Sequence, residues 1–271
     1  MAYLRITMIG LALIFFLLVA APLQWVALRR GWPIRLWIPI FFGRTLARLL
    51  QIKVFAEGRS APGGPRLLAA NHVSWIDILA LCSIEPICFL AKKEVGSWPM
   101  ISAFAQLQET VFVDRKKRKT IPGANSAMAQ RMLAGRCALL FPEGTTGDGL
   151  TLRKFHSSHF AAARDLLAKA HDVEAVSVQP VAIRYSSPSA AWFGDAALLP
   201  HLWSVLKGDP IRCDLVFGAP LAYSRETNRK IMARHVASSI AEMLAAMGPA
   251  TAEGVCHAEP ELDALAATTA L

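Results

Sequence analysis

Charged side chains are scarce in this chain, and acidic ones are the scarcest. Only 18% of its 271 residues are charged, and 29 lysines and arginines against 20 aspartates and glutamates give a net charge of +9. Hydrophobic residues make up 54%, and the mean hydropathy is +0.37. An apolar and basic chain suits an anionic lipid surface or an acidic partner. The basic residues are not accompanied by a zinc-finger, leucine-zipper or aromatic-basic motif, so the sequence predicts no nucleic-acid partner.

Cysteine is also sparse, and its spacing is irregular. The five cysteines are Cys82, Cys88, Cys137, Cys213 and Cys256. An odd number without a CxxC pair predicts neither a disulfide framework nor a zinc site, and it fits a reducing compartment. His156 and His159 are three residues apart, but no third ligand accompanies them, so we expect no metal and no cofactor. The chain also lacks GxSxG, the signature of a nucleophilic serine at a strand–helix turn.

One long uncharged run is present, at residues 6–28 between Arg5 and Arg29. As a helix these residues would measure about 35 Å, enough to cross a hydrocarbon core of about 30 Å. A cleaved signal peptide is the alternative, because residues 19–21 (VAA) resemble a cleavage site. We favour retention, because the apolar run continues past that point. More basic residues follow the run than precede it, which predicts a cytoplasmic membrane protein with its catalytic domain facing the cytoplasm.

The sequence leaves open whether this helix spans the membrane or lies along its surface. Residues 32–50 predict a second membrane-contacting element, because they contain tryptophans and phenylalanines of the interfacial type, with Arg44 and Arg48 on one face. A core helix with a charged rim is the alternative. We therefore expect a transmembrane or interfacial segment at residues 1–50, a catalytic domain at 51–249, and a flexible, small-residue and acidic tail at 250–271.

From residue 51, short apolar runs alternate with helix-length patterns, which predicts an α/β domain. The expected strands are residues 51–55, 66–70, 87–91, 110–113, 138–141, 176–183 and 214–217. The expected helices begin near Trp75, Trp98, Pro122, His159 and Asn228.

The strongest chemical signal is the segment 71–77 (NHVSWID), which follows a buried strand and leads into an apolar helix. Strand ends of this kind carry the sites of α/β folds. His72 lies on the turn, and Asp77 lies in the first helical turn, where its carboxylate can fold back onto the imidazole. Such a carboxylate fixes the tautomer and stabilises the imidazolium. Ser74 and Asp77 also resemble a capping box, in which Asp77 would only cap the helix.

A second polar turn follows the apolar run 138–141, at residues 142–145 (PEGT). Glu143, Gly144 and Thr145 place a carboxylate, a glycine and a hydroxyl at one strand end. Glycine lets backbone N–H groups approach an oxyanion or a phosphate, so this turn is suited to binding a substrate. A simple Pro-Gly loop is the alternative.

Four ordered blocks resemble the glycerolipid acyltransferases that acylate lysophosphatidic acid. They are residues 71–77 (NHxxxxD), 111–115 (VFVDR), 141–145 (FPEGT) and 178–182 (VQPVA). The resemblance covers residues 50–220 and implies a mixed sheet flanked by helices. It also implies that His72 removes the proton from an acceptor hydroxyl, which attacks an acyl thioester directly, while Asp77 orients the imidazole.

The resemblance also assigns binding roles. Glu143, Gly144 and Thr145 would hold the acceptor or place the thioester carbonyl, and Arg115 would bind an acidic headgroup. Arg115 begins the basic run 115–119 (RKKRK), which is otherwise a solvated surface. That run suits anionic lipid or an acidic acyl carrier protein as donor, and acyl-CoA fits equally well.

The acceptor block departs from the pattern of the lysophosphatidate enzymes. Those enzymes usually continue FPEGT with Arg-Ser, whereas this chain continues with residues 146–149 (TGDG). Together with residues 92–95, 98–99, 155–158, 191–195 and 200–203, this loop resembles the lyso-ornithine lipid acyltransferases. Their acceptor carries an α-carboxylate and an amine but no phosphate, so Asp148 is expected to bind the amine. Esterification of the lyso-ornithine lipid hydroxyl would give ornithine lipid.

Two other functions compete with this one. The first is acylation of lysophosphatidate to phosphatidic acid, which requires the loop change to be neutral. The second is a membrane scaffold that has kept the fold without the activity, which the intact His72, Asp77 and Glu143 disfavour.

Overall fold

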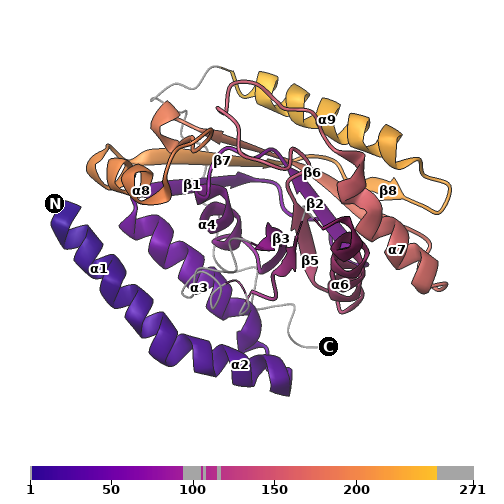
Figure 1. Cartoon of the computed structure of the whole chain (residues 1–271), viewed down its shortest axis with the longest axis horizontal. Helices are drawn as coiled ribbons and strands as arrows, with labels where there is room; N and C mark the ends of the chain where they lie inside the picture. The colour runs from indigo at the N-terminus through magenta and orange to yellow at the C-terminus, as the bar shows by residue number, and fades with distance from the viewer. Residues whose placement is uncertain (1, 94–104, 106–107, 115–116, 249–271) are drawn as a thin grey trace.

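The computed structural model describes residues 2–93, 105, 108–114 and 117–248. These residues form one eight-stranded sheet with helices on both of its faces (Figure 1). The strands are β1 (Ile52–Glu57), β2 (Arg66–Ala70), β3 (Ile87–Lys92), β4 (Val111–Val113), β5 (Cys137–Leu140), β6 (Val176–Tyr185), β7 (Ile211–Phe217) and β8 (Leu221–Tyr223).

The sheet is mixed, as the family resemblance implies. Its strand order is β1-β7-β6-β2-β5-β3-β4, and β8 also pairs with β6. β2 is parallel to both β5 and β6, so their carboxyl ends meet at one edge. β6 is antiparallel to β7 and to β8. The central strands are buried on both faces, which explains why they read as continuous apolar runs rather than alternating ones.

The core consists of two layers, one on each face of the sheet. The strand period of two sends Leu68 and Ala70 of β2 into one layer and Leu67 and Ala69 into the other. The first layer packs against α3 (Ile34–Leu49), α4 (Ile76–Cys82) and α8 (Leu198–Lys207). The second packs against α6 (Ile121–Leu133), α7 (Ala161–Lys169) and α9 (Arg229–Ala246).

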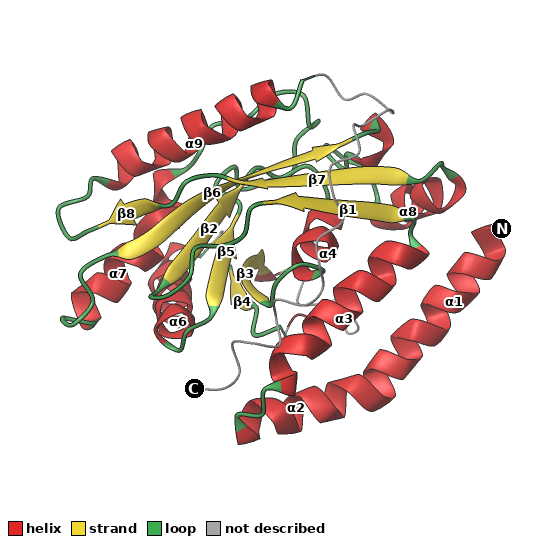
Figure 2. Cartoon of the chain, turned by 180° about the vertical axis from the view of Figure 1, so that it is seen from behind, coloured by secondary structure: helices red, strands yellow, loops and turns green. Residues whose placement is uncertain are grey.

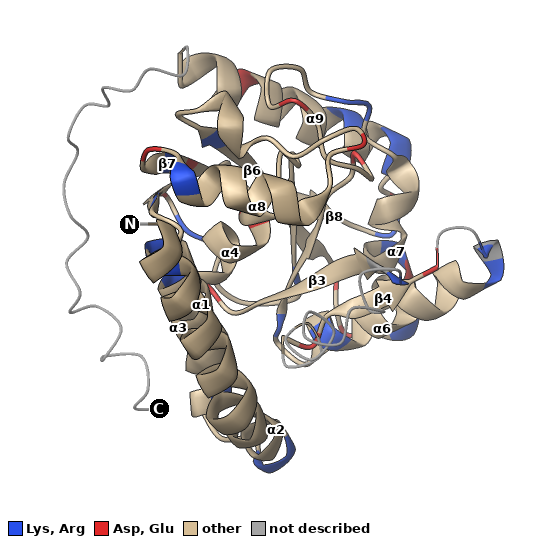
Figure 3. Cartoon of the chain, turned by 60° about the vertical axis from the view of Figure 1, so that its left-hand side comes forward, with Lys and Arg blue, Asp and Glu red and all other residues tan. Residues whose placement is uncertain are grey.

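A long apolar rod precedes the domain. It consists of α1 (Ala2–Phe15), the π-helical turn η1 (Phe16–Ala20) and α2 (Ala21–Arg30), which together form a continuous 29-residue helix that is long and apolar enough to cross a membrane. Its charged residues are Arg5, Arg29 and Arg30, so charge is confined to its ends (Figure 3). Gly31 ends the helix in the left-handed conformation, with φ of 69°.

The rod lies alongside α3 and reaches α8 (Figure 2). Phe16 is buried against Phe42 of α3, with ring centroids 4.8 Å apart. At the other end Tyr3 meets Trp203 of α8 at 5.5 Å. Most of the outer face stays exposed, so the rod presents a long apolar surface.

Helix α3 combines features of both interpretations of residues 32–50. It packs on α4, and Arg44 Nε donates to the carbonyl of Ser83 at 2.8 Å, which ties this arginine into the domain. Trp37 and Phe41 remain exposed on the other side. The helix is therefore a core helix on one face, as the alternative interpretation holds, and an apolar surface on the other.

The seven expected strands are all present, whereas β8 and α8 were not predicted from the sequence. Short 3₁₀ turns complete the described elements, at η3 (Arg118–Thr120), η4 (Ser157–Phe160) and η5 (Pro188–Ala190). The helix expected near Trp98 and the tail expected at 250–271 lie outside the described residues.

Candidate active site

The site lies where β2 and β5 end side by side. His72 follows β2 after one intervening residue, Asn71, whose buried side chain clamps the turn to β6. The Asn71 amide donates from Nδ2 to the Ile183 carbonyl at 2.9 Å and accepts at Oδ1 from the Ile183 N–H at 2.8 Å. Both backbone groups of Ile183 are thus satisfied by one side chain, which fixes the start of the turn.

The structure brings His72 and Asp77 together. Asp77 Oδ2 lies 2.7 Å from His72 Nδ1, and the Asp77 side chain is completely buried. The same oxygen accepts from the N–H groups of Val73 and Ser74, at 2.8 and 3.0 Å. The two interpretations of Asp77 therefore hold at once, because the carboxylate both caps the turn and contacts the imidazole.

This contact decides which ring nitrogen of His72 is free to accept a proton. An ionised carboxylate accepts hydrogen bonds and donates none, so Nδ1 of His72 carries the proton. Nε2 is then unprotonated in the neutral imidazole and can take a proton from a substrate. The His72 side chain is 17% exposed, so the ring keeps access to the surface.

Two further side chains complete this arrangement, and one of them, Tyr185, lies outside the four sequence blocks. The Tyr185 hydroxyl, at the end of β6, donates to Asp77 Oδ1 at 2.6 Å. The Phe141 ring, just after β5, stacks on the imidazole with centroids 3.8 Å apart and an angle of 10° between the planes. The residue alternation along β6 places Tyr185 on the same face as Val181 and Ile183, and this is the one signal in the sequence that points to it.

Glu143 is buried and holds the backbone of the turn. Its Oε1 accepts from the His72 N–H at 2.8 Å, and its Oε2 accepts from the Arg153 N–H at 3.1 Å. Burial raises the pKa of this carboxyl, and the two backbone hydrogen bonds oppose the rise. These contacts give Glu143 a positioning role, and its contact with substrate stays a prediction.

The loop of residues 144–149, here called the acceptor loop, docks on the same turn. The Gly147 N–H donates to the His72 carbonyl at 2.8 Å. Gly144 and Gly149 adopt φ of 76° and 77°, a region that favours glycine. A Cβ on Gly149 would lie 3.1 Å from Val73 Cγ1, so the loop contacts the segment just beyond the base.

Asp148 shapes the acceptor loop. Its Oδ1 accepts from the N–H groups of Thr151 and Leu150, at 3.0 and 2.9 Å. These hydrogen bonds lower the pKa of Asp148, so the carboxylate stays ionised. Thr145 is exposed, and Arg115 lies outside the described residues.

Helix α8 is bound to the segment that follows His72. Trp75 Nε1 donates to His201 Nδ1 at 3.0 Å, and His201 Nε2 lies 3.1 Å from the Ala191 carbonyl. The His201 ring is therefore neutral, and burial lowers its pKa. The Trp192 N–H donates to the Val73 carbonyl at 2.9 Å, which anchors the segment after β6.

Metal ligands do not gather in the described part of the chain, where there is no group of three or more His, Cys, Asp or Glu side chains suited to an ion. The four described cysteines are all buried. Burial raises the pKa of the Cys88 thiol to about 12, so this thiol is a poor ligand and a poor nucleophile.

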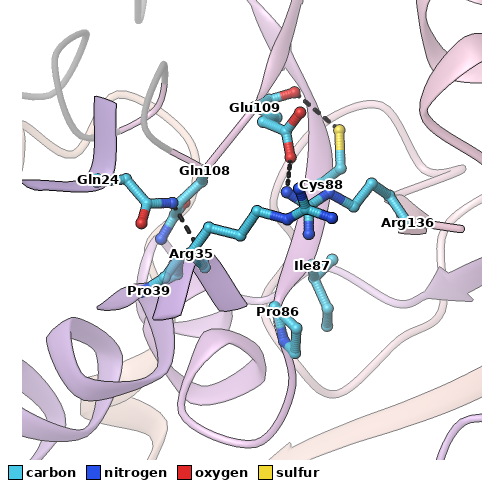
Figure 4. A pocket seen from close by; sticks show the side chains of 9 residues that line it. All are labelled: Gln24, Arg35, Pro39, Pro86, Ile87, Cys88, Gln108, Glu109 and Arg136. Carbon is cyan, nitrogen blue, oxygen red and sulfur yellow. Dashed lines mark hydrogen bonds and ion pairs between the residues drawn. The ribbon is translucent and has the colours of Figure 1, made fainter. Parts of the chain in front are cut away.

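A separate hollow lies at the opposite edge of the sheet, next to the residues that precede β3 and β5 (Figure 4). Glu109 is paired there with Arg131 and Arg136. Arg35 reaches the same hollow from α3. Because His72 follows the carboxyl end of β2, this hollow is not part of the candidate site.

Comparison with known proteins gives consistent results. The Acyltransferase family profile matches residues 51–184. A lyso-ornithine lipid O-acyltransferase of Brucella abortus (strain 2308) is 38% identical over 253 residues, which are 89% of this chain and 94% of the relative. A second, from Rhizobium meliloti (strain 1021), is 37% identical over 89% of this chain and 86% of its own length. A 1-acyl-sn-glycerol-3-phosphate acyltransferase of Neisseria meningitidis serogroup B is 36% identical over 69% of this chain and 73% of its own length.

The fold has a counterpart among solved structures. The crystal structure of the 1-acyl-sn-glycerophosphate acyltransferase from Thermotoga maritima superposes with a TM-score of 0.60 at 19% identity, over 94% of this chain and all of that one. The likeness confirms the predicted fold class, and the sequence relatives confirm the predicted acyl transfer. The chain therefore belongs to the glycerolipid acyltransferase family and is an acyltransferase of lysolipids.

Proposed function

We propose that this enzyme transfers a fatty acyl group from a thioester to the hydroxyl of lyso-ornithine lipid, giving ornithine lipid. The observation that carries the proposal is the acceptor loop. It is hydrogen-bonded to the backbone of His72, it has Thr146 at the position where the lysophosphatidate enzymes usually have arginine, and it carries the anionic Asp148 two residues later. The relatives named lyso-ornithine lipid O-acyltransferase support this acceptor.

The proposed reaction needs one base and no covalent enzyme intermediate. His72 Nε2 removes the proton of the acceptor hydroxyl as its oxygen attacks the thioester carbonyl carbon. The carbon–sulfur bond then breaks, and the leaving thiolate takes the proton back from the imidazolium. Asp77, 2.7 Å from Nδ1, stabilises the positive charge in between. A base positioned in this way contributes about 10²–10⁴ in rate.

A zwitterionic headgroup fits the charges beside His72. Asp148 stays ionised and offers an anion for the ornithine amine. Arg153 offers a cation for the α-carboxylate, and its Nε lies 3.6 Å from the position that a Cβ would take on Gly147. The Arg153 side chain therefore lies next to Gly147 of the acceptor loop. Arg153 has no ion-pair partner within the described residues, so its guanidinium is available.

The donor and the location complete the proposal. The basic run 115–119 attracts an acyl carrier protein or CoA thioester, since both carry negative charge. The apolar rod of residues 2–30 attaches the enzyme to the inner membrane, and the basic residues that follow it favour a catalytic domain on the cytoplasmic side. Lysolipid and enzyme then meet at the same surface.

Acylation of lysophosphatidate is the second candidate, because the relative of Neisseria meningitidis carries that name and the basic run can bind a phosphate. The test supplies membranes containing this protein with labelled acyl carrier protein thioester and either lyso-ornithine lipid or lysophosphatidate. We expect label in ornithine lipid. Label in phosphatidate alone would contradict the proposed acceptor and make the loop change neutral.

Two variants connect this result to the acceptor loop. Asp148→Asn and Arg153→Gln should each raise the KM for lyso-ornithine lipid roughly 10-fold, because each removes one charged contact. Arg164→Gln is the matched control, since Arg164 is exposed on α7 and pairs with Asp165. An unchanged KM in both loop variants would exclude this mode of headgroup binding.

A further inference from the structure

The buried carboxylate of Asp77 depends on two different sets of donors. Three groups share Oδ2, namely Nδ1 of His72 and the N–H groups of Val73 and Ser74. Oδ1 faces the other way, and within the described residues its donor is the Tyr185 hydroxyl at 2.6 Å. Without that hydroxyl, one oxygen of a fully buried carboxylate would have no hydrogen-bond partner.

Tyr185 is held rigidly in place. It ends β6, is 6% exposed and pairs in register with Cys213 of β7. Two residues earlier on the same face, Ile183 is clamped by Asn71 through both of its backbone groups. The hydroxyl therefore reaches Asp77 from a fixed strand on the side opposite His72.

We propose that Tyr185 is a positioning residue for the transfer reaction, and that its hydroxyl keeps the Asp77 carboxylate ionised and in the plane that faces His72. The inference rests on the proposed roles of His72 and Asp77. A buried carboxylate that lacks a donor is protonated more easily, since the charged form is no longer compensated. A protonated Asp77 cannot stabilise the imidazolium on which the transfer depends.

The titratable groups around Asp77 and Tyr185 are compatible with Tyr185 as the donor to Oδ1. Burial and the charge of Asp77 raise the pKa of Tyr185 well above its usual value, so the hydroxyl keeps its proton and donates. Burial and Asp77 likewise raise the pKa of the Cys213 thiol from β7, which stays neutral. Glu143, beyond β5, faces the backbone N–H of His72.

The chain allows a well-matched test, because it contains only three tyrosines, Tyr3, Tyr185 and Tyr223. Tyr185→Phe removes the hydroxyl and keeps the ring. We expect kcat to fall roughly 10-fold with both KM values unchanged, as for the loss of one hydrogen bond to a charged group. We also expect the acid limb of kcat against pH to move up by about half a unit or more, since the Asp77–His72 pair takes up its inactivating proton at a higher pH once the donor to Oδ1 is gone.

Tyr223→Phe is the matched control, because Tyr223 is a buried tyrosine on β8 in the other core layer. It should keep the wild-type kcat and pH profile. An acid limb in Tyr185→Phe that coincides with wild type would overturn the inference. A thermal melt of each variant separates loss of fold from loss of rate.

Fluorotyrosine gives a second measurement that preserves shape. In a Tyr3→Phe/Tyr223→Phe background, incorporated 3-fluorotyrosine occupies position 185 alone, and its more acidic hydroxyl donates more strongly. The acid limb should then move to lower pH, opposite to the shift in Tyr185→Phe. A shift in the same direction as Tyr185→Phe would contradict a role as donor.

A double-mutant cycle tests whether Tyr185 acts through Asp77. In the Asp77→Asn background, Tyr185→Phe should lower kcat by less than a further 2-fold. If it instead lowers kcat by the same factor as in the wild-type background, the inference is overturned. His72→Ala distinguishes the proposed role of His72 from that of Tyr185. Wild-type turnover in His72→Ala would refute the proposed base itself. A His72→Ala variant slowed by about 10²–10⁴, together with an unaltered Tyr185→Phe, would refute only the role of Tyr185.

Discussion

The backbone on both sides of the His72 ring is fixed by other segments. Its N–H donates to Glu143 and its carbonyl accepts from Gly147, both at 2.8 Å. The ring is stacked on Phe141 and hydrogen-bonded to Asp77. A base held in this way has little freedom to lose when substrate binds, which favours the transfer step.

The first prediction concerns the base. His72→Ala should lower kcat by about 10²–10⁴ while the protein stays folded, because the backbone contacts of the residue remain. Acyl transfer and a thermal melt measure the two quantities. His171→Ala, which changes an exposed histidine outside the site, should behave as wild type. Wild-type turnover in His72→Ala would refute the mechanism.

The second prediction concerns Asn71. Asn71→Ala should lower the free energy of unfolding by about 2–4 kcal/mol, because the buried N–H and C=O of Ile183 both lose their partner. Denaturant unfolding measures this loss. Asn228→Ala removes only the exposed N-cap of α9 and should cost about 1 kcal/mol. Equal losses in the free energy of unfolding for the two variants would contradict the role of Asn71 in fixing the turn.

Some residues of the candidate site could be predicted from the sequence and others could not. His72 and Asp77 are five residues apart, and the turn between them is a local pattern that the sequence displays. Tyr185 is 108 residues from Asp77, and their contact depends on β6 lying next to β2. The alternation along β6 places Tyr185 on a core face, but no local period of the chain encodes which residue of another segment it meets, so its contact with Asp77 could not be predicted from the sequence.

Among the elements, the rod of α1 and α2 has the most unusual surface. It buries Phe16 and Ala27, yet Leu4, Leu11 and Leu18 are each more than 60% exposed. The free energy gained by covering such a surface is large, roughly 1.5–3 kcal/mol per leucine. Under the proposed attachment to the membrane, a lipid bilayer supplies that cover.

The third prediction follows from this surface. Leu11→Lys/Leu18→Lys should reduce binding to anionic phospholipid vesicles at least 10-fold without changing the thermal melt, since both side chains are exposed at 62% and 68%. Vesicle sedimentation measures the binding. Leu133→Lys, on the exposed face of α6, should bind as wild type. Unchanged binding in the double variant would exclude the rod as the attachment.

The elements were predicted unevenly, for physical reasons. Buried parallel strands read as apolar runs, so β2 was predicted with both of its ends correct. Helix α8 was not predicted, because Pro200 lies near its start and reads as a helix breaker, although proline fits a first helical turn. For α3, exposed aromatics favoured a membrane, whereas Arg44 is bound to Ser83 within the domain.

Across the whole molecule, a net charge of +9 favours acidic donors. The fourth prediction is that kcat/KM with acyl carrier protein thioester falls at least 10-fold between about 0.05 and 0.5 M salt, because exposed charges are screened. An uncharged short thioester should show little change in the same assay. Equal salt dependence for both donors would contradict electrostatic capture of the carrier.

The contacts of the acceptor loop are made mainly by main-chain atoms. Gly147 reaches His72 through its N–H, and Trp192 reaches Val73 in the same manner from the opposite flank. Main-chain hydrogen bonds tolerate replacement of the neighbouring side chains. The side chains of Thr145 and Thr146 can therefore be replaced while His72 stays where it is, whereas Asp148 also shapes the loop through its carboxylate. An enzyme built in this way can change its headgroup preference by point substitution in the loop, while the proposed reaction at His72 stays the same.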